Sequence, residues 1–484
     1  MKNINITFLG IIIVLSSQFA ILNAQNNDTT RIIILHTNDM HAKIDQMPKL
    51  AYYVNYYRNK NNNVFLFSAG DNFTGNPIVD QYNPLGYPMI DLMNKIGFDI
   101  SCFGNHEFDY GQENVNKYIA QANFPFISSN IVFSKKSVLK EPAPYHKFKC
   151  NDGTTIGVFS VIEVNRMGIP DCSPLKVQNL SFANPIKTAK KYISYKDSSD
   201  IFIALTHLGF KGDKKLAKKV PVFDAIIGGH SHTLLPNGEI KKGALICQAD
   251  CYINYLGVLT LKVVKGEIVS KKDSLIQLND DTKVNPEIAK LVKEYNNNPS
   301  LYKTIAYSKN GINGIDELGS MMTDAILDTL DVDIAFQNVG GIRLDSISAG
   351  KIIVKQIFEL SPFGNTLVEF NLTPKQIKKL IKYTYNFHKK NELQVSGLII
   401  NLEVNKKRKL KKISLKTPEG KSLTKDTYKV VVNDYMAAAY GLSFLKNGKE
   451  HPIIDAENTI RFIKDKKNID YTGVKRVFET VLGE

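Results

Sequence analysis

Five of the nine histidines follow short apolar runs, and they share these positions with two aspartates and one asparagine. Imidazole, carboxylate and amide oxygen are the ligands that zinc, manganese and iron accept in proteins. A single histidine of this kind is more often a hydrogen-bonded turn residue, but five together with two carboxylates are hard to explain by packing. The pattern therefore predicts a divalent-metal site formed by these residues: Asp39, His41, Asp71, Asn105, His106, His207, His230 and His232.

The size of this set indicates which chemistry the site performs. It holds too many candidate ligands for one ion that keeps positions open for a substrate, but it suits two ions that share a carboxylate. Two metals about 3.5–4 Å apart can hold both the attacking and the leaving oxygen of a phosphoryl transfer. The residues thus favour metal-assisted hydrolysis of a phosphoric ester.

The elements that must position these residues are short buried strands. Runs of apolar, β-rich residues bounded by glycine or asparagine precede each group, at 32–35, 64–67, 100–103, 201–205 and 225–227. Helical stretches at 49–57 and 88–95 lie between some of them. Strands that alternate with helices predict a layered α/β domain, in which functional groups gather beyond the carboxyl ends of the strands.

The character of the chain changes near residue 280. Asn285 and Pro286 form a helix start, and apolar residues follow at helical spacing up to Tyr295. We therefore expect a first domain at 31–280, a linker helix within 281–301 and a second, mixed α/β domain at 302–484. Expected strands of the second domain are 333–336, 398–404 and 428–432, and the Lys-rich run at 406–409 indicates a solvated hairpin tip.

Composition and charge narrow the class of protein. With 484 residues, of which 43% are apolar and 23% charged, the chain is neither disordered nor fibrous. Its net charge of +15 suits an anionic small substrate, a nucleic acid or an anionic membrane surface. The basic residues are spread along the chain without a nucleic-acid module, so nucleic acid is not expected as the main partner.

The five cysteines form no CxxC pair, so a cysteine zinc site is not expected. Because five is an odd number, at least one cysteine stays unpaired, and Cys102 lies in an apolar run typical of a core. The sequence leaves any pairing of the others open.

The first 24 residues resemble an export signal. Lys2 precedes an apolar run at 8–15, and Ala24 is followed by a polar stretch. The run is too short for a membrane span, which needs about 20 apolar residues. We expect residues 1–24 to be a cleaved signal peptide and the mature protein to act in the periplasm or at the cell exterior, the alternative being an uncleaved anchor.

The motifs and their order along the chain resemble those of a known family. Five motifs resemble, in this order, the signature of the calcineurin-like metallophosphoesterases. They are Asp39-Met40-His41, Gly70-Asp71, the Gly-Asn-His-Glu run at 104–107, His207 and the Gly-His-Ser-His run at 229–232. The segments 35–39 and 104–109, with the added C-terminal domain, narrow this to the 5′-nucleotidase family, which includes exported bifunctional UDP-sugar hydrolase/5′-nucleotidases. The resemblance implies a layered αββα metallophosphoesterase domain joined by the linker helix to a smaller mixed α/β substrate-binding domain.

The resemblance also implies roles in the metal centre, which would hold two divalent ions of the Zn, Mn or Fe type. One ion would be bound by Asp39, His41 and His232, the other by Asn105, His207 and His230, with Asp71 as the bridge. His106 would lie beside the substrate phosphate, oriented by Asp109. The nucleophile would be a metal-bound hydroxide that attacks phosphorus in line.

Other polar residues near these motifs have supporting roles in this interpretation. His36 and His146 are expected to be structural or surface residues. Asn38 and Glu107 belong to the motifs, and we expect them to hold turns or to orient the ligands by hydrogen bonds.

The second domain carries the substrate contacts that the family implies. The segment 338–343 resembles an Asn-x-Gly-Gly-Ile-Arg element, in which Asn338 and Arg343 would contact the nucleotide. Phe363 and Tyr435 would stack on either side of the base. The pocket departs from the family at Leu442, where an aspartate that binds the ribose hydroxyls is expected. An arginine expected upstream of residues 318–320 is also missing.

Three functions follow from these observations. The first is hydrolysis of nucleotides by a 5′-nucleotidase, with cleavage of UDP-sugars as a further activity. The second, suggested by the altered pocket, is a phosphodiesterase for 2′,3′-cyclic nucleotides or another phosphomonoesterase. The third is a catalytically idle nucleotide-binding surface protein, against which the complete ligand set argues.

Overall fold

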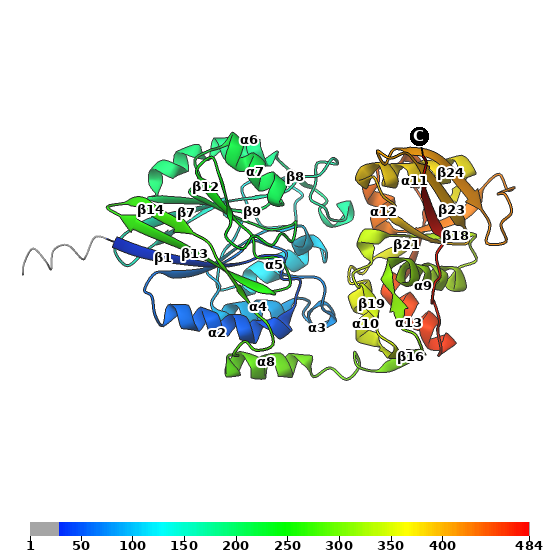
Figure 1. Ribbon diagram of the computed structural model, residues 1–484, viewed down its shortest axis with the longest axis horizontal. Coiled ribbons are helices and arrows are strands. Elements are labelled where there is room, and N and C mark those ends of the chain that lie inside the picture. Colours follow the sequence, from blue (N-terminus) through cyan, green and yellow to red (C-terminus); the bar gives the residue numbers. More distant parts are fainter. Residues whose placement is uncertain (1–28, 484) are drawn as a thin grey trace, which may run out of the picture.

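The computed structural model describes residues 29–483, so the expected signal peptide lies outside the described residues. The chain forms two domains side by side, and one helix, α8, leads from the first to the second (Figure 1). Among the described residues, no helix combines the length and apolar character that a membrane crossing requires.

Two β-sheets form the centre of the N-terminal domain. The first sheet has the order β14-β13-β1-β2-β3-β4, with β15 added beside β13, and the second has the order β11-β12-β10-β9-β7-β6. The strands of the first sheet are β1 (Thr29–Thr37), β2 (Val64–Ser68), β3 (Ile100–Cys102), β4 (Phe126–Ile127), β13 (Tyr255–Val264), β14 (Glu267–Lys272) and β15 (Leu275–Gln277). Those of the second are β6 (Tyr145–Lys149), β7 (Thr155–Ile162), β9 (Ile201–His207), β10 (Ala225–Gly228), β11 (Glu239–Lys241) and β12 (Ala244–Cys247). All five strands predicted from the sequence are present.

The central strand β1 shows how the layers form. Ile32 and Ile34 point into the core between the two sheets, whereas Ile33 and Leu35 pack with the helices that cover the first sheet. A strand that is buried on both faces is apolar at every position, which is why the run 32–35 does not alternate with polar residues. The arrangement is the layered αββα fold that the family resemblance implies.

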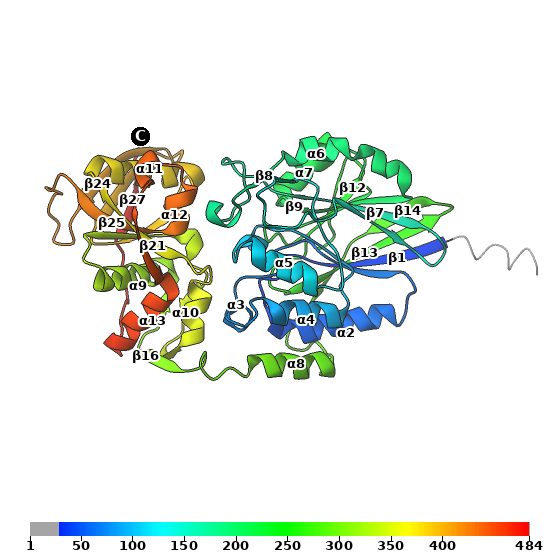
Figure 2. The same ribbon diagram turned by 180° about the vertical axis from the view of Figure 1, so that it is seen from behind.

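Helices cover the outer face of each sheet, as both views show (Figures 1 and 2). The first sheet is covered by α2 (Met47–Arg58), α3 (Pro77–Asp80), α4 (Tyr87–Ile96) and α5 (Gln112–Gln121). The second sheet is covered by α6 (Pro185–Lys191) and α7 (Phe210–Lys219). A small ribbon pairs β5 (Ile131–Phe133) with β8 (Leu180–Phe182).

The helix α8 (Pro286–Asn296) begins where the sequence predicts, with the side chain of Asn285 accepting a hydrogen bond from the Ile288 amide at 3.1 Å. It packs on the N-terminal domain. Ile288 and Val292 belong to the same apolar core as α2 and α4. The Asn285 amide also donates to the Pro48 carbonyl at 2.8 Å.

The C-terminal domain is built on a five-stranded sheet of order β22-β18-β25-β21-β26 and a three-stranded sheet of order β24-β23-β27. Their strands are β18 (Ile334–Asn338), β21 (Thr366–Leu372), β22 (Leu393–Ser396), β23 (Ile399–Val404), β24 (Leu410–Lys416), β25 (Tyr428–Asn433), β26 (Lys449–Ile454) and β27 (Val477–Val481). Two short pairs join β16 (Thr304–Ser308) to β20 (Gly350–Ile353) and β17 (Ile312–Asn313) to β19 (Ser346–Ile347). The helices are α9 (Gly314–Thr329), α10 (Val354–Leu360), α11 (Pro374–His388), α12 (Asp434–Ala439) and α13 (Asp455–Lys466). The Lys-rich run at 406–409 lies in the turn between β23 and β24, as predicted.

The five cysteines are all free and buried in the described part of the chain. Cys102 packs between the two sheets with Ile34 and Ile100, which confirms the predicted core position.

Candidate active site

The strand ends of both sheets meet at one edge of the N-terminal domain, and the candidate ligands lie there. Each sheet contributes, because the sandwich places the carboxyl ends of its parallel strands next to one another. Asp39 and His41 follow β1, Asp71 follows β2, Asn105 follows β3, His207 ends β9, and His230 and His232 follow β10.

One group of side chains gathers around Asp39. His41 Nε2 lies 3.2 Å from His232 Nε2. His232 Nε2 in turn lies 3.5 Å from Asp39 Oδ1. The three side chains are close enough to bind one ion together.

A second group gathers around Asp71. His207 Nε2 lies 3.0 Å from Asp71 Oδ2 and 3.8 Å from Asp39 Oδ1. His230 Nδ1 lies 3.0 Å from the Asn105 side-chain oxygen. Asp71 also lies beside the first group, since a carboxylate oxygen of Asp71 and ring nitrogens of His41 and His106 all lie within 4.8 Å of one another.

The hydrogen bonds of two histidines show which ring nitrogens face the site. His41 Nδ1 donates to the Thr74 carbonyl at 3.0 Å, and His207 Nδ1 donates to the Ala69 carbonyl at 2.7 Å. Each Nε2 is therefore the atom that faces the site. His207 Nε2 is buried without a hydrogen bond, 3.0 Å from a carboxylate oxygen. The lone pairs of the His207 nitrogen and the Asp71 oxygen repel each other unless a positive charge, either a proton or a metal ion, lies between them. The residues present therefore fit a divalent metal.

The ionisation of the site agrees with this requirement. Burial raises the pKa of the Asp71 carboxyl, but His207 and His106 beside it hold that pKa well below its ordinary value. Burial and the neighbouring His106 lower the pKa of His41 to about 3, which keeps this ring neutral as a ligand must be. For His207, the Asp71 and Asp39 carboxylates outweigh the effect of burial and raise the pKa to about 10, so this position attracts a cation.

The backbone is strained at the candidate ligands. Non-glycine residues rarely adopt positive φ, and each such residue costs of order 1–3 kcal/mol unless the surroundings compensate it. Such strain clusters where function requires it. Five of the seven candidate metal ligands have this conformation: Asp39 (49°), His41 (45°), Asp71 (53°), His230 (76°) and His232 (49°).

Glu107 holds the Asp71 turn in place. Its carboxylate accepts hydrogen bonds from the backbone amides of Asp71 (3.0 Å), Asn72 (2.8 Å) and Gly104 (2.6 Å) and from the Asn72 side chain (3.0 Å). Gly104 is needed beside it, since a Cβ at this residue would lie 2.1 Å from Asp71 Oδ1. Glu107 thus orients a candidate ligand, the kind of supporting role expected for it.

His106 lies at the opening of the cluster and is paired with Asp109. Its Nδ1 lies 2.7 Å from Asp109 Oδ2. Burial lowers the pKa of His106, but the Asp109 and Asp71 carboxylates outweigh it and raise that pKa to about 9. The ring is therefore cationic at neutral pH, with Nε2 4.0 Å from Asp71 Oδ2.

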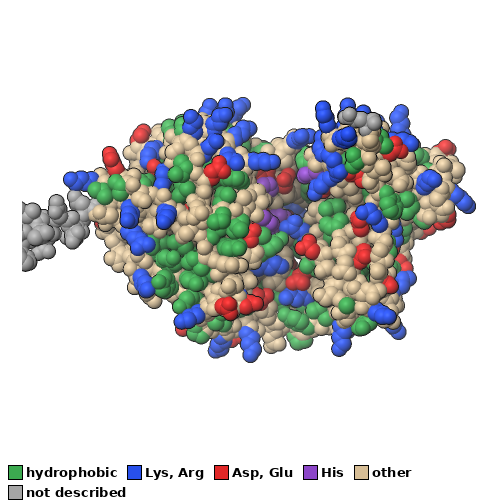
Figure 3. All heavy atoms as spheres, in the orientation of Figure 1, with side chains coloured by type: hydrophobic (Ala, Val, Ile, Leu, Met, Phe, Trp, Pro, Cys, Tyr) green, Lys and Arg blue, Asp and Glu red, His purple; other side chains and the backbone are tan. Residues whose placement is uncertain are grey.

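A cavity of about 550 Å³ lies between the two domains and reaches this cluster. Histidine side chains are visible in the hollow between the domains (Figure 3). From the N-terminal domain the cavity is lined by candidate site residues including Asp71, Asn105, His106, Asp109, His230 and His232. All four predicted substrate contacts line its other side: Asn338, Arg343, Phe363 and Tyr435.

These contacts approach the cluster closely. The Phe363 ring stacks on His106 with a centroid distance of 5.7 Å. The Arg343 guanidinium carbon lies 5.7 Å from the Phe363 ring centre. The charge of Arg343 adds to the lowering of the His41 pKa and opposes, without reversing, the rise of the His106 pKa. Asn338 Oδ1 accepts a hydrogen bond from Asn433 at 2.7 Å.

The cavity also contains residues that the sequence analysis missed. Tyr383, Phe387, Glu392 and Tyr440 line it on the side of the C-terminal domain, and Arg166 lies over the Phe387 ring from the N-terminal domain at 4.9 Å. The motifs gave no signal for them: Tyr383 and Phe387 lie on α11, Glu392 directly precedes β22, and Tyr440 directly follows α12, two residues before the altered position Leu442. Leu442 packs against the apolar core of the C-terminal domain and is not among the described residues that line the cavity.

Comparisons with known proteins match both halves of this arrangement. Residues 32–234 match the family model of calcineurin-like phosphoesterases, and residues 300–446 match that of the 5′-nucleotidase C-terminal domain. The chain belongs to the 5′-nucleotidase family. It is a metal-dependent phosphoesterase of the 5′-nucleotidase type.

Individual relatives extend over most of the chain. The trifunctional nucleotide phosphoesterase YfkN of Bacillus subtilis is 28% identical over 84% of this chain, which spans only 32% of that protein. The 5′-nucleotidase of Bos taurus is 25% identical over 86% of this chain and 85% of its own length. The crystal structure of a 5′-nucleotidase precursor from Thermus thermophilus, 25% identical, covers 94% of this chain and 100% of its own, with a TM-score of 0.80.

Replacing Glu107 by glutamine tests its positioning role. The amide keeps the size of the side chain but converts one acceptor oxygen into a donor that faces backbone amides, so the Asp71 turn should shift. We expect metal affinity to fall about 10–100-fold, the range typical of lost supporting contacts at metal sites. Metal titration of the purified variant measures this change. Glu113→Gln, an exposed residue of α5, is the matched control, and equal affinities in both variants would contradict the role.

Proposed function

We propose that this phosphoesterase removes phosphate from nucleoside 5′-monophosphates. The observation that carries the proposal is the cavity between the domains, which joins the histidine and aspartate cluster to a side built of aromatic rings and an arginine. A phosphate at the cluster and a nucleoside against the C-terminal domain would fill the two ends of this cavity.

The proposed metal ligands are Asp39, His41 and His232 for one ion and Asn105, His207 and His230 for the other, with Asp71 shared between them. Two divalent ions bound there would polarise the phosphoryl oxygens and lower the pKa of a bound water toward about 7. Ligands of these types bind zinc, manganese and iron in proteins.

The residues around the cluster have separate roles in this proposal. His106, cationic and at the opening of the cluster, donates a hydrogen bond to a phosphoryl oxygen or to the oxygen of the departing alcohol. Asp109 fixes the orientation of the His106 ring through its 2.7 Å contact. Arg343 offers the planar pair of donors that suits a phosphate group.

The nucleoside would lie in the C-terminal part of the cavity. Phe363 and Tyr435 supply flat apolar faces for a base, and stacking of this kind accepts different bases. Asn338 supplies a polar contact from the end of β18. We further propose that residues 31–280 perform the chemistry, that 302–484 select the substrate, and that the protein is exported after loss of residues 1–24.

A second candidate function is favoured by Leu442. Because this side chain lies against the core, the ribose contact expected of the family is missing at this position. A site with weaker hold on the ribose would accept 2′,3′-cyclic nucleotides or simple phosphomonoesters. Cleavage of UDP-sugars at the pyrophosphate needs the same metal chemistry and stays a further proposal.

A substrate panel distinguishes these functions. Phosphate release from AMP and from an aryl phosphate is measured directly, and cleavage of UDP-glucose and 2′,3′-cyclic AMP by product analysis, each with added Mn²⁺ or Zn²⁺ and with EDTA. We expect the highest kcat/KM for AMP and loss of all turnover in EDTA. Turnover of the cyclic or aryl ester without turnover of AMP would instead support the second function.

Two substitutions separate metal binding from proton donation. Asp71→Ala removes the shared carboxylate, so bound metal and activity should be lost together. His106→Ala should retain the metal and lower kcat about 10²–10⁴-fold, the usual contribution of a general acid. Metal analysis and initial rates on the same samples test both expectations, and full turnover in His106→Ala would falsify the role of this histidine.

Tyr435→Ala tests recognition of the base. Stacking of a base on an aromatic side chain contributes about 1–3 kcal/mol, so KM for AMP should rise about 5–150-fold. The rate with an aryl phosphate, which has no base, should change much less. Tyr435→Phe retains the ring and is the control, with KM expected close to the wild-type value. An equal loss on both substrates would mean that Tyr435 does not contact the base.

A further inference from the structure

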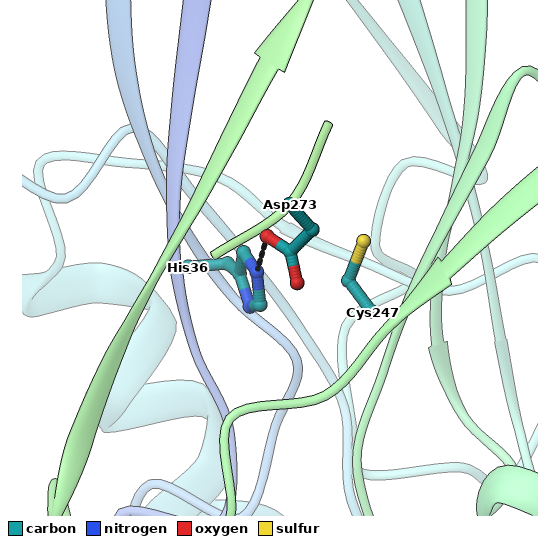
Figure 4. Close-up of side chains that lie close together, drawn as sticks. All are labelled: His36, Cys247 and Asp273. Atoms are coloured by element: carbon teal, nitrogen blue, oxygen red, sulfur yellow. Dashed lines mark hydrogen bonds and ion pairs between the residues drawn. The ribbon is translucent and has the colours of Figure 1, made fainter. Parts of the chain in front are cut away.

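A second group of metal-binding side chains is buried between the two sheets. His36 of β1, Cys247 at the end of β12 and Asp273 just after β14 lie with their ligand atoms within 4.8 Å of one another (Figure 4). Their exposed fractions are 0%, 0% and 1%. Cys247 comes from one sheet and the other two residues from the opposite sheet, so the cluster bridges the sandwich.

The cluster lies in a space that the fold keeps open. His36 faces Gly257 across the β1–β13 pair. A Cβ on Gly257 would lie 2.1 Å from atoms of the His36 ring, so only glycine leaves room for the imidazole at this position. Around Cys247 the core is apolar and includes Ile34 and Leu259.

Polar atoms in this cluster lack partners. His36 Nε2 lies 3.1 Å from Asp273 Oδ1, but His36 Nδ1 and Asp273 Oδ2 are buried with no hydrogen bond. In Figure 4 the second oxygen of Asp273 points into the space between the imidazole and the thiol. A carboxylate buried with an unpaired oxygen is costly, because the interior does not replace the water that it loses.

The chemistry of the three side chains matches one class of cation. A thiolate, a carboxylate and a neutral imidazole carry two negative charges together, which a divalent ion balances. Zinc is bound by these three ligand types, with Zn–N and Zn–O distances of about 2.0–2.2 Å. Two such ligands at tetrahedral angles lie about 3.3 Å apart. The observed 3.1 Å between His36 Nε2 and Asp273 Oδ1 is close to this value.

We propose that His36, Cys247 and Asp273 bind a structural zinc-class divalent ion, separate from the metal pair of the active site. Binding releases the thiol proton of Cys247 and leaves the thiolate as ligand. A fourth ligand, such as a water molecule, would complete the tetrahedral shell. The ion joins the two sheets within a core whose neighbouring side chains around Cys247 are apolar, the thiol otherwise lying 3.8 Å from the Leu245 carbonyl oxygen.

The position of the ion connects it to the active site. His36 lies three residues before Asp39 in β1. Cys247 directly precedes Gln248, whose side chain bonds Ser231 Oγ (3.0 Å), the Thr233 amide (3.0 Å) and the Gly229 carbonyl (3.2 Å). These residues form the loop that carries His230 and His232. The ion therefore anchors the segments of both sheets that lead to the proposed metal ligands of the active site.

Cobalt substitution tests the proposal without relying on activity. The protein is produced in cells grown with cobalt, because a site this deeply buried must be filled as the chain folds. A thiolate bound to Co²⁺ gives a charge-transfer band in the near ultraviolet, and the proposed active-site ligands contain no cysteine. We expect this band in the wild type and in Cys102→Ala, a matched control buried in the same core, and its loss in Cys247→Ala.

Metal content gives a second, independent measurement. In the zinc-loaded protein, Cys247→Ala should hold one ion fewer per chain than the wild type and Cys102→Ala. If Cys247→Ala does not fold, the wild-type cobalt spectrum decides alone. A cobalt-containing wild type without a thiolate band would overturn the proposal and leave the cluster as a hydrogen-bonded group, in which the thiol donates to Asp273. Equal zinc content in wild type and a folded Cys247→Ala would do the same.

Discussion

The approach of His207 to Asp71 is the interaction on which the rest of the structure depends. An imidazole nitrogen and a carboxylate oxygen lie 3.0 Å apart in a fully buried position, and the Ala69 carbonyl holds the other ring nitrogen. Such an arrangement is stable only when a positive charge lies between the two groups. The strained turns bring the candidate ligands together around this pair, while the close backbone contact at Gly104 and the Glu107 hydrogen bonds hold the Asp71 turn.

The two domains contribute side chains of different polarity to the cavity. The N-terminal edge supplies charge and lone pairs, while the C-terminal domain supplies flat aromatic faces and one arginine. Neither set encloses a nucleotide by itself. Phe363 of the C-terminal domain stacks on His106 of the N-terminal domain, so the two sets lie close together. The aromatic rings are therefore within a few ångströms of the residues at which phosphate chemistry would take place.

The sequence predicted the layered fold and the convergence of the strand ends because both depend on local patterns. An uninterrupted apolar run followed by a polar residue defines a buried strand and its exit, as at 32–35 before Asp39. Other features depend on contacts between distant segments. Three features have no signature in the sequence: the positive φ angles of the candidate ligands, the approach of Arg343 to His41, and the presence of Tyr383 and Glu392 in the cavity. His36, Cys247 and Asp273 show the same limit: they come from three separated strands or strand ends, so the lack of a CxxC motif could not reveal their proximity.

The packing of α8 has a consequence for how the chain can be divided. The helix was expected to be a connector, yet its apolar side completes the core of the first domain. Its last turn is also attached there, with Tyr295 bonded to Asp91 and Asn296 bonded to Asp45, each at 2.7 Å. Beyond the helix, Leu301 is buried in the same core, and its carbonyl accepts a hydrogen bond from the Lys355 amide of α10 at 2.8 Å, so the connection is attached to both domains at this residue. An expression boundary placed before the helix would open a hole in the first domain, and one placed directly after residue 296 would still remove Leu301 from that core, so the first domain is kept whole only by a boundary beyond Leu301.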